Sequence, residues 1–180
     1  MMFPRIGFGY DVHRLASGYE FWLGGIKLDF PLGAVGHSDA DVLLHAICDA
    51  LLGAAALHDI GYHFPNNDPQ YKGISSLLLL KEVAKLLQHH EYQIGNIDST
   101  IILEQPKIAP YIPQMQQNIA QTLQIPITSI SIKATTSEGL GYEGRQEGIS
   151  AFAVALVFSK NLYINNFPEE NYNFSKFNKF

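Results

Sequence analysis

A chain of 180 residues is long enough for one domain with a hydrophobic core and too short for two ordinary domains. Hydrophobic residues make up 47% of the chain and charged residues 16%, which is typical of a soluble globular protein. The net charge of −5 argues against nucleic acid as the main partner, because a phosphate backbone binds a basic surface. A small phosphorylated substrate is compatible with this charge, since it needs only a few cations, helix ends or metal ions.

Secretion and membrane insertion are not indicated. The first residues lack the long apolar core of a signal peptide, and no run approaches the roughly 20 apolar residues of a membrane span. The single cysteine, Cys48, has no partner for an internal disulfide, and its apolar neighbours predict a buried, unreactive thiol. We therefore expect a cytoplasmic protein that binds neither membrane nor nucleic acid.

The first predicted strand covers Arg5–Tyr10, where glycines allow close approach of another backbone. It leads directly into Asp11 and His13. Residues two apart in an extended chain project to the same face, so these two side chains point together. A carboxylate beside an imidazole suits a divalent metal such as zinc, although such a pair also occurs often by chance.

After a hairpin predicted at Phe21–Phe30, residues 42–57 form a long apolar segment that we expect to be a buried helix. Ser38 followed three residues later by Asp41 matches a capping box at its start. The free N–H groups of this helix end favour an anion beside His37 and Ser38. An ordinary helix cap and a phosphate site are both open interpretations.

His45 and Asp49 lie inside the apolar segment, and burying them costs free energy unless each finds a partner. His45 would complete a zinc site with Asp11 and His13, leaving the fourth position open as catalytic zinc sites do. Asp41 and Asp49 lie four residues on either side of His45, so either could orient its other ring nitrogen. An ordinary core hydrogen bond to His45 is the alternative.

The second half of the chain alternates helices and strands. A long polar loop, His58–Lys72, comes first, and loops of this kind are often functional. The predicted elements that follow are a helix from Ile74 to about His90, a strand at Ile94–Glu104, a helix at Ile112–Leu123, and strands at Ile130–Thr135 and Ile149–Ser159. The last strand is apolar enough to be buried on both faces or in a subunit contact.

A glycine-rich polar connection, Thr135–Arg145, precedes the last strand. Its hydroxyl groups, backbone donors and Arg145 suit a phosphate, and Glu138 could hold a second metal ion. After Lys160 the chain becomes rich in Asn and aromatic residues without a clear period. We therefore predict one domain at residues 1–160 and a tail at 161–180 that is flexible or draped on the surface.

Five segments in chain order carry a resemblance to a known family: GYDVH, HSDADVLLHAICDALLGAAALHDIG, FPNND, PKIAPYIPQM and KATTSEGLGYEGRQEGI. Together they resemble the 2-C-methyl-D-erythritol 2,4-cyclodiphosphate synthases of the non-mevalonate route to isoprenoid precursors, over about Arg5–Ser159. The resemblance implies an α/β (α+β) fold in a single domain, with a mixed four-stranded sheet and helices on one side. It also implies a homotrimer with the sheets packed around a central axis and active sites between neighbouring subunits.

The resemblance also implies the reaction. The family converts 4-diphosphocytidyl-2-C-methyl-D-erythritol 2-phosphate into a cyclic diphosphate and CMP, through attack of the 2-phosphate on the β-phosphorus. Such enzymes are phosphorus–oxygen lyases. Zinc on Asp11, His13 and His45 would polarise the β-phosphate, and Mg²⁺ or Mn²⁺ on Glu138 would bridge the diphosphate. His37 and Thr136 match the positions that stabilise the transition state.

Substrate contacts carry over to several segments. Asp59, Ile60 and Gly61 match the segment that holds the methylerythritol, with Phe64, Pro65, Asn66, Asn67 and Asp68 as a flexible loop over it. Leu103, Glu104, Gln105, Pro106, Lys107, Ile108 and Ala109, with Ala134, Thr135 and Thr136, match the cytidine pocket. The remaining implied contacts are Asp11, His13, His37, Ser38, Ser137, Glu138, Tyr142 and Arg145.

Two departures from the family pattern stand out. Asn66 replaces a common aspartate, which removes one charge near the sugar, and we expect a tuned affinity. Tyr10 and Tyr142 replace frequent phenylalanines near Arg145 in an axial channel that can hold an isoprenoid diphosphate in family members. We expect their hydroxyl groups to make this channel more polar. Two other functions remain open, a zinc phosphohydrolase and a non-catalytic trimeric binder of isoprenoid diphosphates.

Overall fold

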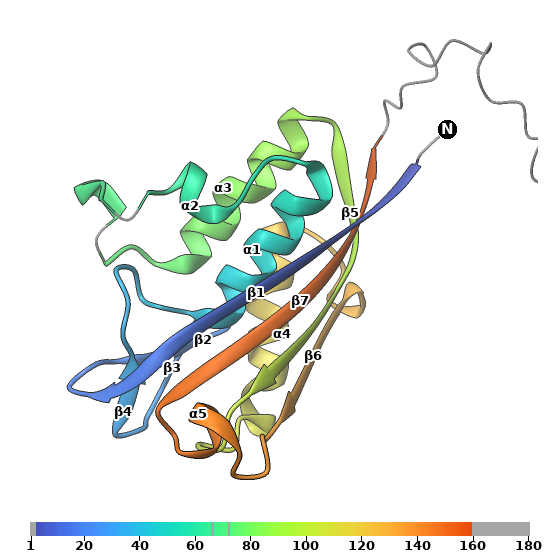
Figure 1. Cartoon of the computed structure of the whole chain (residues 1–180). Helices are drawn as coiled ribbons and strands as arrows, with labels where there is room; N and C mark the ends of the chain where they lie inside the picture. The colour runs from blue at the N-terminus through green and yellow to red at the C-terminus, as the bar shows by residue number, and fades with distance from the viewer. Residues whose placement is uncertain (1–2, 66, 72, 160–180) are drawn as a thin grey trace, which may run out of the picture.

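A mixed sheet of five strands forms the body of the computed structural model, which describes residues 3–65, 67–71 and 73–159 (Figure 1). Its strands, in spatial order, are β4 (Leu32–Ala34), β1 (Phe3–Ser17), β7 (Gly148–Ser159), β5 (Tyr92–Ile102) and β6 (Ile130–Thr135). β6 runs parallel to β5, and the other neighbours are antiparallel. The predicted mixed α+β domain is confirmed. The predicted number of four strands is wrong, because the three-residue β4 adds an edge strand too short to show a period.

The helices α1 (Val42–Ala55), α3 (Ser76–His89) and α4 (Ile112–Leu123) cover one face of this sheet (Figure 1). The short elements are the hairpin strands β2 (Phe21–Leu23) and β3 (Ile26–Leu28), the helices α2 (Ile60–His63) and α5 (Gly141–Gly144), and 3₁₀ turns at Pro69–Tyr71, Ala109–Tyr111 and Ile127–Ser129. The predicted helices and strands are therefore present. Among the described residues, no helix has the length and apolarity needed to cross a bilayer.

Several boundaries differ from the prediction. β1 continues past Tyr10 to Ser17, because it pairs with β7 through Arg14. α3 begins at Ser76, two residues after the predicted start, because Ser75 still has extended backbone. Asn66 and the tail at 161–180, both subjects of a prediction, lie outside the described residues.

Helix α1 is buried almost all round, as predicted, and packs on β1 and β7. Gly7 and Gly9 allow this packing: a Cβ at Gly7 would lie 1.9 Å from the Ala50 carbonyl oxygen, and one at Gly9 would lie 2.0 Å from that of Ala46. The helix therefore lies directly on the backbone of β1. Each fully buried leucine of α1 stabilises the fold by about 1.5–3 kcal/mol. Cys48 is fully buried, and burial raises the pKa of its thiol, which confirms the prediction of an unreactive cysteine.

The start of α1 is capped by Asp41 alone. Its carboxylate accepts from Leu44 N–H at 3.1 Å and from Gly25 N–H in the β2–β3 turn at 2.7 Å. The predicted capping box with Ser38 is wrong, because Ala40 has a φ of 55° and turns the chain before the helix begins. Ser38 Oγ instead accepts from the N–H of Ala40 at 3.1 Å.

The other face of the sheet is apolar, and none of the helices at residues 3–159 covers it. Successive residues of β1 alternate between the two faces, so Ile6, Phe8, Tyr10 and Val12 point away from α1. Ile6 is 73% exposed and Phe8 63%, and Val154 on β7 is exposed beside them. These large apolar side chains form an exposed patch on this face of the sheet.

Candidate active site

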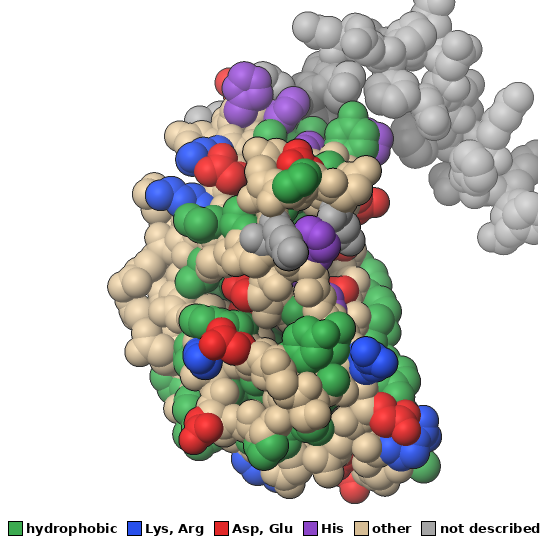
Figure 2. All heavy atoms as spheres, turned by 90° about the vertical axis from the view of Figure 1, so that its left-hand side faces the viewer, with side chains coloured by type: hydrophobic (Ala, Val, Ile, Leu, Met, Phe, Trp, Pro, Cys, Tyr) green, Lys and Arg blue, Asp and Glu red, His purple; other side chains and the backbone are tan. Residues whose placement is uncertain are grey.

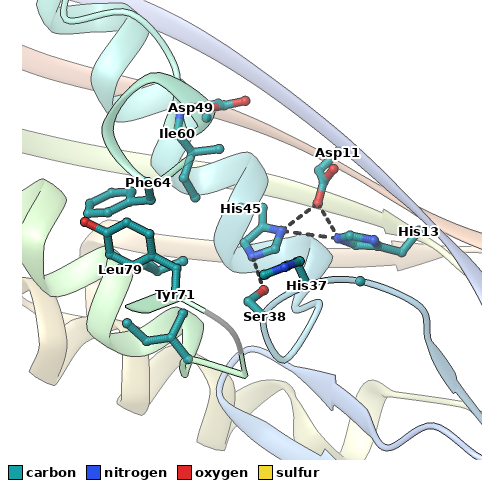
Figure 3. A pocket seen from close by; sticks show the side chains of 13 residues that line it. Asp11, His13, His37, Ser38, His45, Asp49, Ile60, Phe64, Tyr71 and Leu79 are labelled. Atoms are coloured by element: carbon teal, nitrogen blue, oxygen red, sulfur yellow. Dashed lines mark hydrogen bonds and ion pairs between the residues drawn. The ribbon is translucent and has the colours of Figure 1, made fainter. Parts of the chain in front are cut away.

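Three side chains converge where β1 passes over α1 (Figure 3). Asp11 Oδ2 lies 3.1 Å from His13 Nε2 and 3.0 Å from His45 Nδ1, and these two nitrogens are 3.3 Å apart. Asp11 and His13 follow Gly7 and Gly9 on the α1-facing side of β1, so the glycines that admit the helix also bring His45 to them. Among the described residues, these three side chains form the one group of His, Cys, Asp or Glu whose geometry could hold a metal ion.

The hydrogen bonds of the two imidazoles assign their tautomers. His13 Nδ1 lies 3.1 Å from the Val35 carbonyl oxygen, which can only accept, so Nδ1 carries the proton. His45 Nε2 lies 2.9 Å from Ser76 Oγ, whose hydroxyl donates to a carboxylate, so this nitrogen carries the proton of His45. Two nitrogen lone pairs and the Asp11 carboxylate therefore face one point. This donor set fits a zinc ion, which binds imidazole nitrogen and carboxylate oxygen with a fourth position left open.

Electrostatics at Asp11 and His13 agree with cation binding. Burial raises the pKa of Asp11, but hydrogen bonds with His13 and His45 outweigh burial and lower it to about 2. Burial lowers the pKa of His13, and the neighbouring Asp11 carboxylate more than offsets this and raises it. The carboxylate is thus ionised over the whole physiological range, and positive charge beside it is favoured.

The predicted role of Asp41 or Asp49 in orienting His45 is wrong. Asp41 caps α1, and Asp49 accepts from Ile60 N–H at 2.8 Å, where burial raises its pKa. His45 Nε2 instead contacts two hydroxyl groups. Ser76 Oγ of α3 lies 2.9 Å away and Ser38 Oγ lies 3.2 Å away. Ser76 lies 31 residues from His45 in the chain, so no local spacing could indicate this contact.

A cavity of about 230 Å³ opens beside the three converging side chains. The predicted site residues that line it are Asp11, His13, His37, Ser38, His45, Ile60, Gly61 and Phe64. Figure 3 shows Asp11, His13, His37, Ser38 and His45 at one end of the cavity and Phe64, Tyr71 and Leu79 at the other. The cavity therefore suits a small ligand with an anionic group and a carbon skeleton. The sequence did not indicate Tyr71 and Leu79 as lining residues, because they fall in a predicted loop and a predicted helix with no pattern that marks a site.

Asp59 does not line this cavity. Its Oδ1 accepts from Tyr62 N–H at 2.8 Å and caps α2, which places Ile60 and Gly61 at the cavity wall. Pro65, Asn67 and Asp68 lie in the turn that follows α2, where Asp68 binds the N–H and side-chain amide of Gln70. In sequence, these residues lie between Phe64 and Tyr71, which line the cavity. None of their described interactions reaches the polar end of the cavity.

A second polar cluster lies at the opposite edge of the sheet, where β5 and β6 end. Glu104 accepts from Ser137 N–H at 3.0 Å, from the Ser137 hydroxyl at 3.2 Å and from Gly139 N–H at 3.2 Å. The Thr136 hydroxyl donates to the exposed Glu138 carboxylate at 2.9 Å. Backbone hydrogen bonds from Gly139 and Ser137 lower the pKa of Glu104. This carboxylate therefore fastens the loop that carries the predicted Thr136 and Glu138.

The two clusters do not meet within one chain. Strand pairing places Asp11 level with Ala151, Ile101 and Ala134, at the same end of the sheet but three strand spacings apart, roughly 14 Å. The described residues of segments 103–109 and 134–138 are absent from the lining of the 230 Å³ cavity. One chain thus contains two separate halves of the predicted site.

A model of the YgbB family matches residues 4–158. The chain belongs to the YgbB family. The 2-C-methyl-D-erythritol 2,4-cyclodiphosphate synthase of Porphyromonas gingivalis is 61% identical over 155 residues, which are 86% of this chain and 96% of that protein. The structure of IspF from Plasmodium falciparum in complex with CDP matches with a TM-score of 0.77 and 35% identity, covering 88% of this chain and 97% of that one. The bifunctional IspDF from Campylobacter jejuni matches with a TM-score of 0.85 and 35% identity, covering 88% of this chain and 43% of that longer chain.

Membership of the YgbB family confirms the resemblance and makes the chain a member of an enzyme family, because its named relatives are synthases. The predicted channel residues of this YgbB chain are partly in contact. Tyr10 and Tyr142 hydroxyl oxygens lie 3.1 Å apart, and that of Tyr142 lies 2.6 Å from Ser150 Oγ. Burial raises the pKa of Tyr142 to about 12. Arg145 forms an exposed ion pair with Glu147 at 2.8 Å and does not contact either tyrosine in the described interactions.

Charged side chains are dispersed over one face of this YgbB chain. On the face drawn in Figure 2, the described Lys and Arg side chains are scattered among acidic and uncharged ones (Figure 2). A polyanion needs a continuous basic surface, which this face does not offer. A small anion bound at one point of the cavity needs no such surface.

Proposed function

We propose that this chain converts 4-diphosphocytidyl-2-C-methyl-D-erythritol 2-phosphate into 2-C-methyl-D-erythritol 2,4-cyclodiphosphate and CMP. The observation that carries the proposal is the convergence of Asp11 Oδ2, His13 Nε2 and His45 Nδ1 at one end of a partly apolar cavity. The 61% identity to a synthase of this name supports the choice of substrate. The enzyme would act as a phosphorus–oxygen lyase in the non-mevalonate route to isoprenoid precursors, in the cytoplasm.

The reaction is an intramolecular phosphoryl transfer. An oxygen of the 2-phosphate attacks the β-phosphorus and forms the new bond that closes the ring. The bond from the β-phosphorus to the bridging oxygen breaks, and CMP leaves with that oxygen. Water takes no part, so catalysis consists mainly of positioning two phosphates and neutralising their charge.

When bound, zinc on Asp11, His13 and His45 and Mg²⁺ or Mn²⁺ on Glu138 supply Lewis-acid polarisation of the diphosphate. The chain's own groups hold the reacting phosphates in place. Ser38 Oγ already accepts from Ala40 N–H and lies within reach of His45 Nε2, so its own proton is free for a phosphate oxygen. His37 lines the same end of the cavity, and we assign it and Thr136 to the charge that develops in the transition state.

The rest of the substrate would occupy two places. Ile60, Gly61 and Phe64 form the less polar wall that suits the methylerythritol carbon skeleton. Segments 103–109 and 134–136, at the far edge of the sheet, are assigned to the cytidine. A complex of the Plasmodium falciparum IspF with CDP supports a cytidine nucleotide as ligand.

We propose a homotrimer, because two features of the single chain are explained by contact with neighbouring subunits. The outward face of β1 and β7 is apolar and is not covered by the described helices, with Ile6 and Phe8 prominently exposed. The two polar clusters lie at opposite edges of one sheet. Packing three sheets around an axis covers the apolar face and brings the second cluster of one subunit to the metal ligands of the next.

The experiment is incubation of the purified protein with the diphosphocytidyl substrate and Mg²⁺, followed by phosphorus NMR. The proposal predicts CMP and a cyclic diphosphate in equal amounts. Inorganic phosphate or hydrolysed nucleotide would indicate a zinc phosphohydrolase instead. Unchanged substrate would favour a non-catalytic binder, for which isothermal titration with an isoprenoid diphosphate is the following measurement.

A further inference from the structure

The start of α3 carries a buried hydroxyl that the proposed reaction does not use. Ser76 is fully buried, and its Oγ lies 2.9 Å from His45 Nε2, on the side of the ring away from Asp11 and His13. The same hydroxyl forms a short hydrogen bond with the carboxylate of Asp39. Three elements, the loop before α1, the start of α3 and α1 itself, therefore meet behind one metal ligand.

The direction of each hydrogen bond in this group is fixed by chemistry. The Asp39 carboxylate accepts from the Ser76 hydroxyl and also from Ser76 N–H at 2.8 Å. Because the only proton of the hydroxyl is directed to Asp39, Ser76 Oγ can only accept from His45. His45 must then carry its proton on Nε2, which leaves the lone pair of Nδ1 facing Asp11 and His13.

We propose that Asp39 and Ser76 are positioning residues that hold His45 in the tautomer and orientation that bind the metal ion. This inference rests on the metal site of the proposed function. Partners of this kind behind a ligating histidine raise its basicity and fix its ring, and their removal typically weakens metal binding by about 10–100-fold.

Backbone hydrogen bonds make this arrangement rigid. Asp39 N–H donates to the Ile74 carbonyl at 3.1 Å, and Gly73 N–H donates to the His37 carbonyl at 2.8 Å. The loop that carries His37 and Asp39 is thus fastened to the start of α3 at several points. Metal affinity therefore depends on the docking of α3, which is remote from the metal ligands in sequence.

The test compares Ser76→Ala with the matched variant Ser75→Ala. Ser75 is the neighbouring residue at the helix start, and its side chain makes no capping hydrogen bond. Zinc affinity is measured by competition with a chelator of known affinity. We expect Ser76→Ala to lose about 10-fold or more and Ser75→Ala to stay within about twofold of the parent. Ser76→Thr, which keeps the hydroxyl, should retain most of the zinc affinity. Circular dichroism checks that each variant is folded.

Nitrogen-15 NMR of the histidine rings gives a second reading that does not depend on turnover. The parent should show His45 protonated on Nε2, and Ser76→Ala should show a mixture of both tautomers. If Ser76→Ala does not fold, Asp39→Asn replaces it, because the amide presents N–H groups where Ser76 needs an acceptor. Unchanged zinc affinity and an unchanged tautomer in the folded variant would overturn the inference while leaving the cyclase intact. Absence of cyclisation with a Ser76-dependent zinc affinity would overturn the proposed function alone.

Discussion

The two polar clusters of this chain are built in opposite ways. Asp11, His13 and His45 project from a paired strand and a buried helix that lie in direct backbone contact at Gly7 and Gly9. The cluster at the other edge lies in a loop, and the Glu104 carboxylate fastens it to the end of β5. The first arrangement resists distortion, as a metal site with set ligand distances requires. The second rests on a loop, which can adjust its position more readily.

Removing a metal ligand should have the largest effect. We expect His45→Ala to lower turnover by about 1,000-fold or more and to abolish stoichiometric zinc, because the lone pair at the centre of the donor set is lost. The helix should remain, since the leucines of α1 and their burial are unchanged. CMP release, metal analysis and size-exclusion chromatography measure the three quantities.

His89→Ala is the matched control, because His89 is exposed at the end of α3 and should leave all three quantities unchanged. Asp11→Ala should repeat the loss seen with His45→Ala. Full activity in both His45→Ala and Asp11→Ala would refute the assignment of the metal site.

Loosening the second cluster should have a smaller and separable effect. In Glu104→Gln, the oxygen that accepts from Ser137 and Gly139 N–H becomes a neutral amide oxygen, so these hydrogen bonds lose their charge assistance and the loop loses part of its anchor. We expect kcat/KM to fall by roughly 10-fold with zinc affinity unchanged. Glu82→Gln, which affects an exposed ion pair with Lys85, is the control. Weaker zinc binding in Glu104→Gln would contradict two clusters that act separately.

The sequence predicted the first cluster better than the second for a physical reason. An Asp-x-His pair on a strand and a histidine in an apolar helix are local patterns, and two glycines on the same strand face indicate close packing. The partners behind His45 come from Ser76 and Asp39, and a contact across 31 residues leaves no local signal. Strand β4 escaped prediction likewise, because three residues have no period and its existence depends on pairing with the end of β1.

The sequence also contains no indication of the distance between the two clusters. Asp11 and Ala134 are level in the sheet, but only the strand order β4-β1-β7-β5-β6 shows that two strands separate them. The family resemblance identified the residues of both clusters. The distance between the clusters follows only from the strand pairing of the structure. Motif order alone cannot distinguish a site within one chain from a site shared by two.

The prediction with the smallest effect on turnover is a titration at the buried start of α1. Burial raises the pKa of Asp41 from 3.8 to about 6. The folded chain therefore binds this proton more tightly than the unfolded chain, so Asp41 makes stability fall as pH rises from about 4 to 6. Carbon-13 NMR should place the midpoint of its carboxyl near pH 6. Asp98, whose pKa the Lys133 hydrogen bond lowers, should titrate below 3.8. A midpoint near 4 for Asp41 would show that this helix start is hydrated.

The most direct measurement of a site shared between subunits is complementation. Chains with His45→Ala lack the first cluster, and chains with both Thr136→Ala and Glu138→Ala lack the second. Co-expressed in equal amounts, they should regain about a quarter of the parent's CMP release, because one site in four then combines two intact halves from neighbouring chains. Each variant alone should be inactive. Activity of the mixture no higher than the sum of the two separate variants would contradict a site assembled across the subunit boundary.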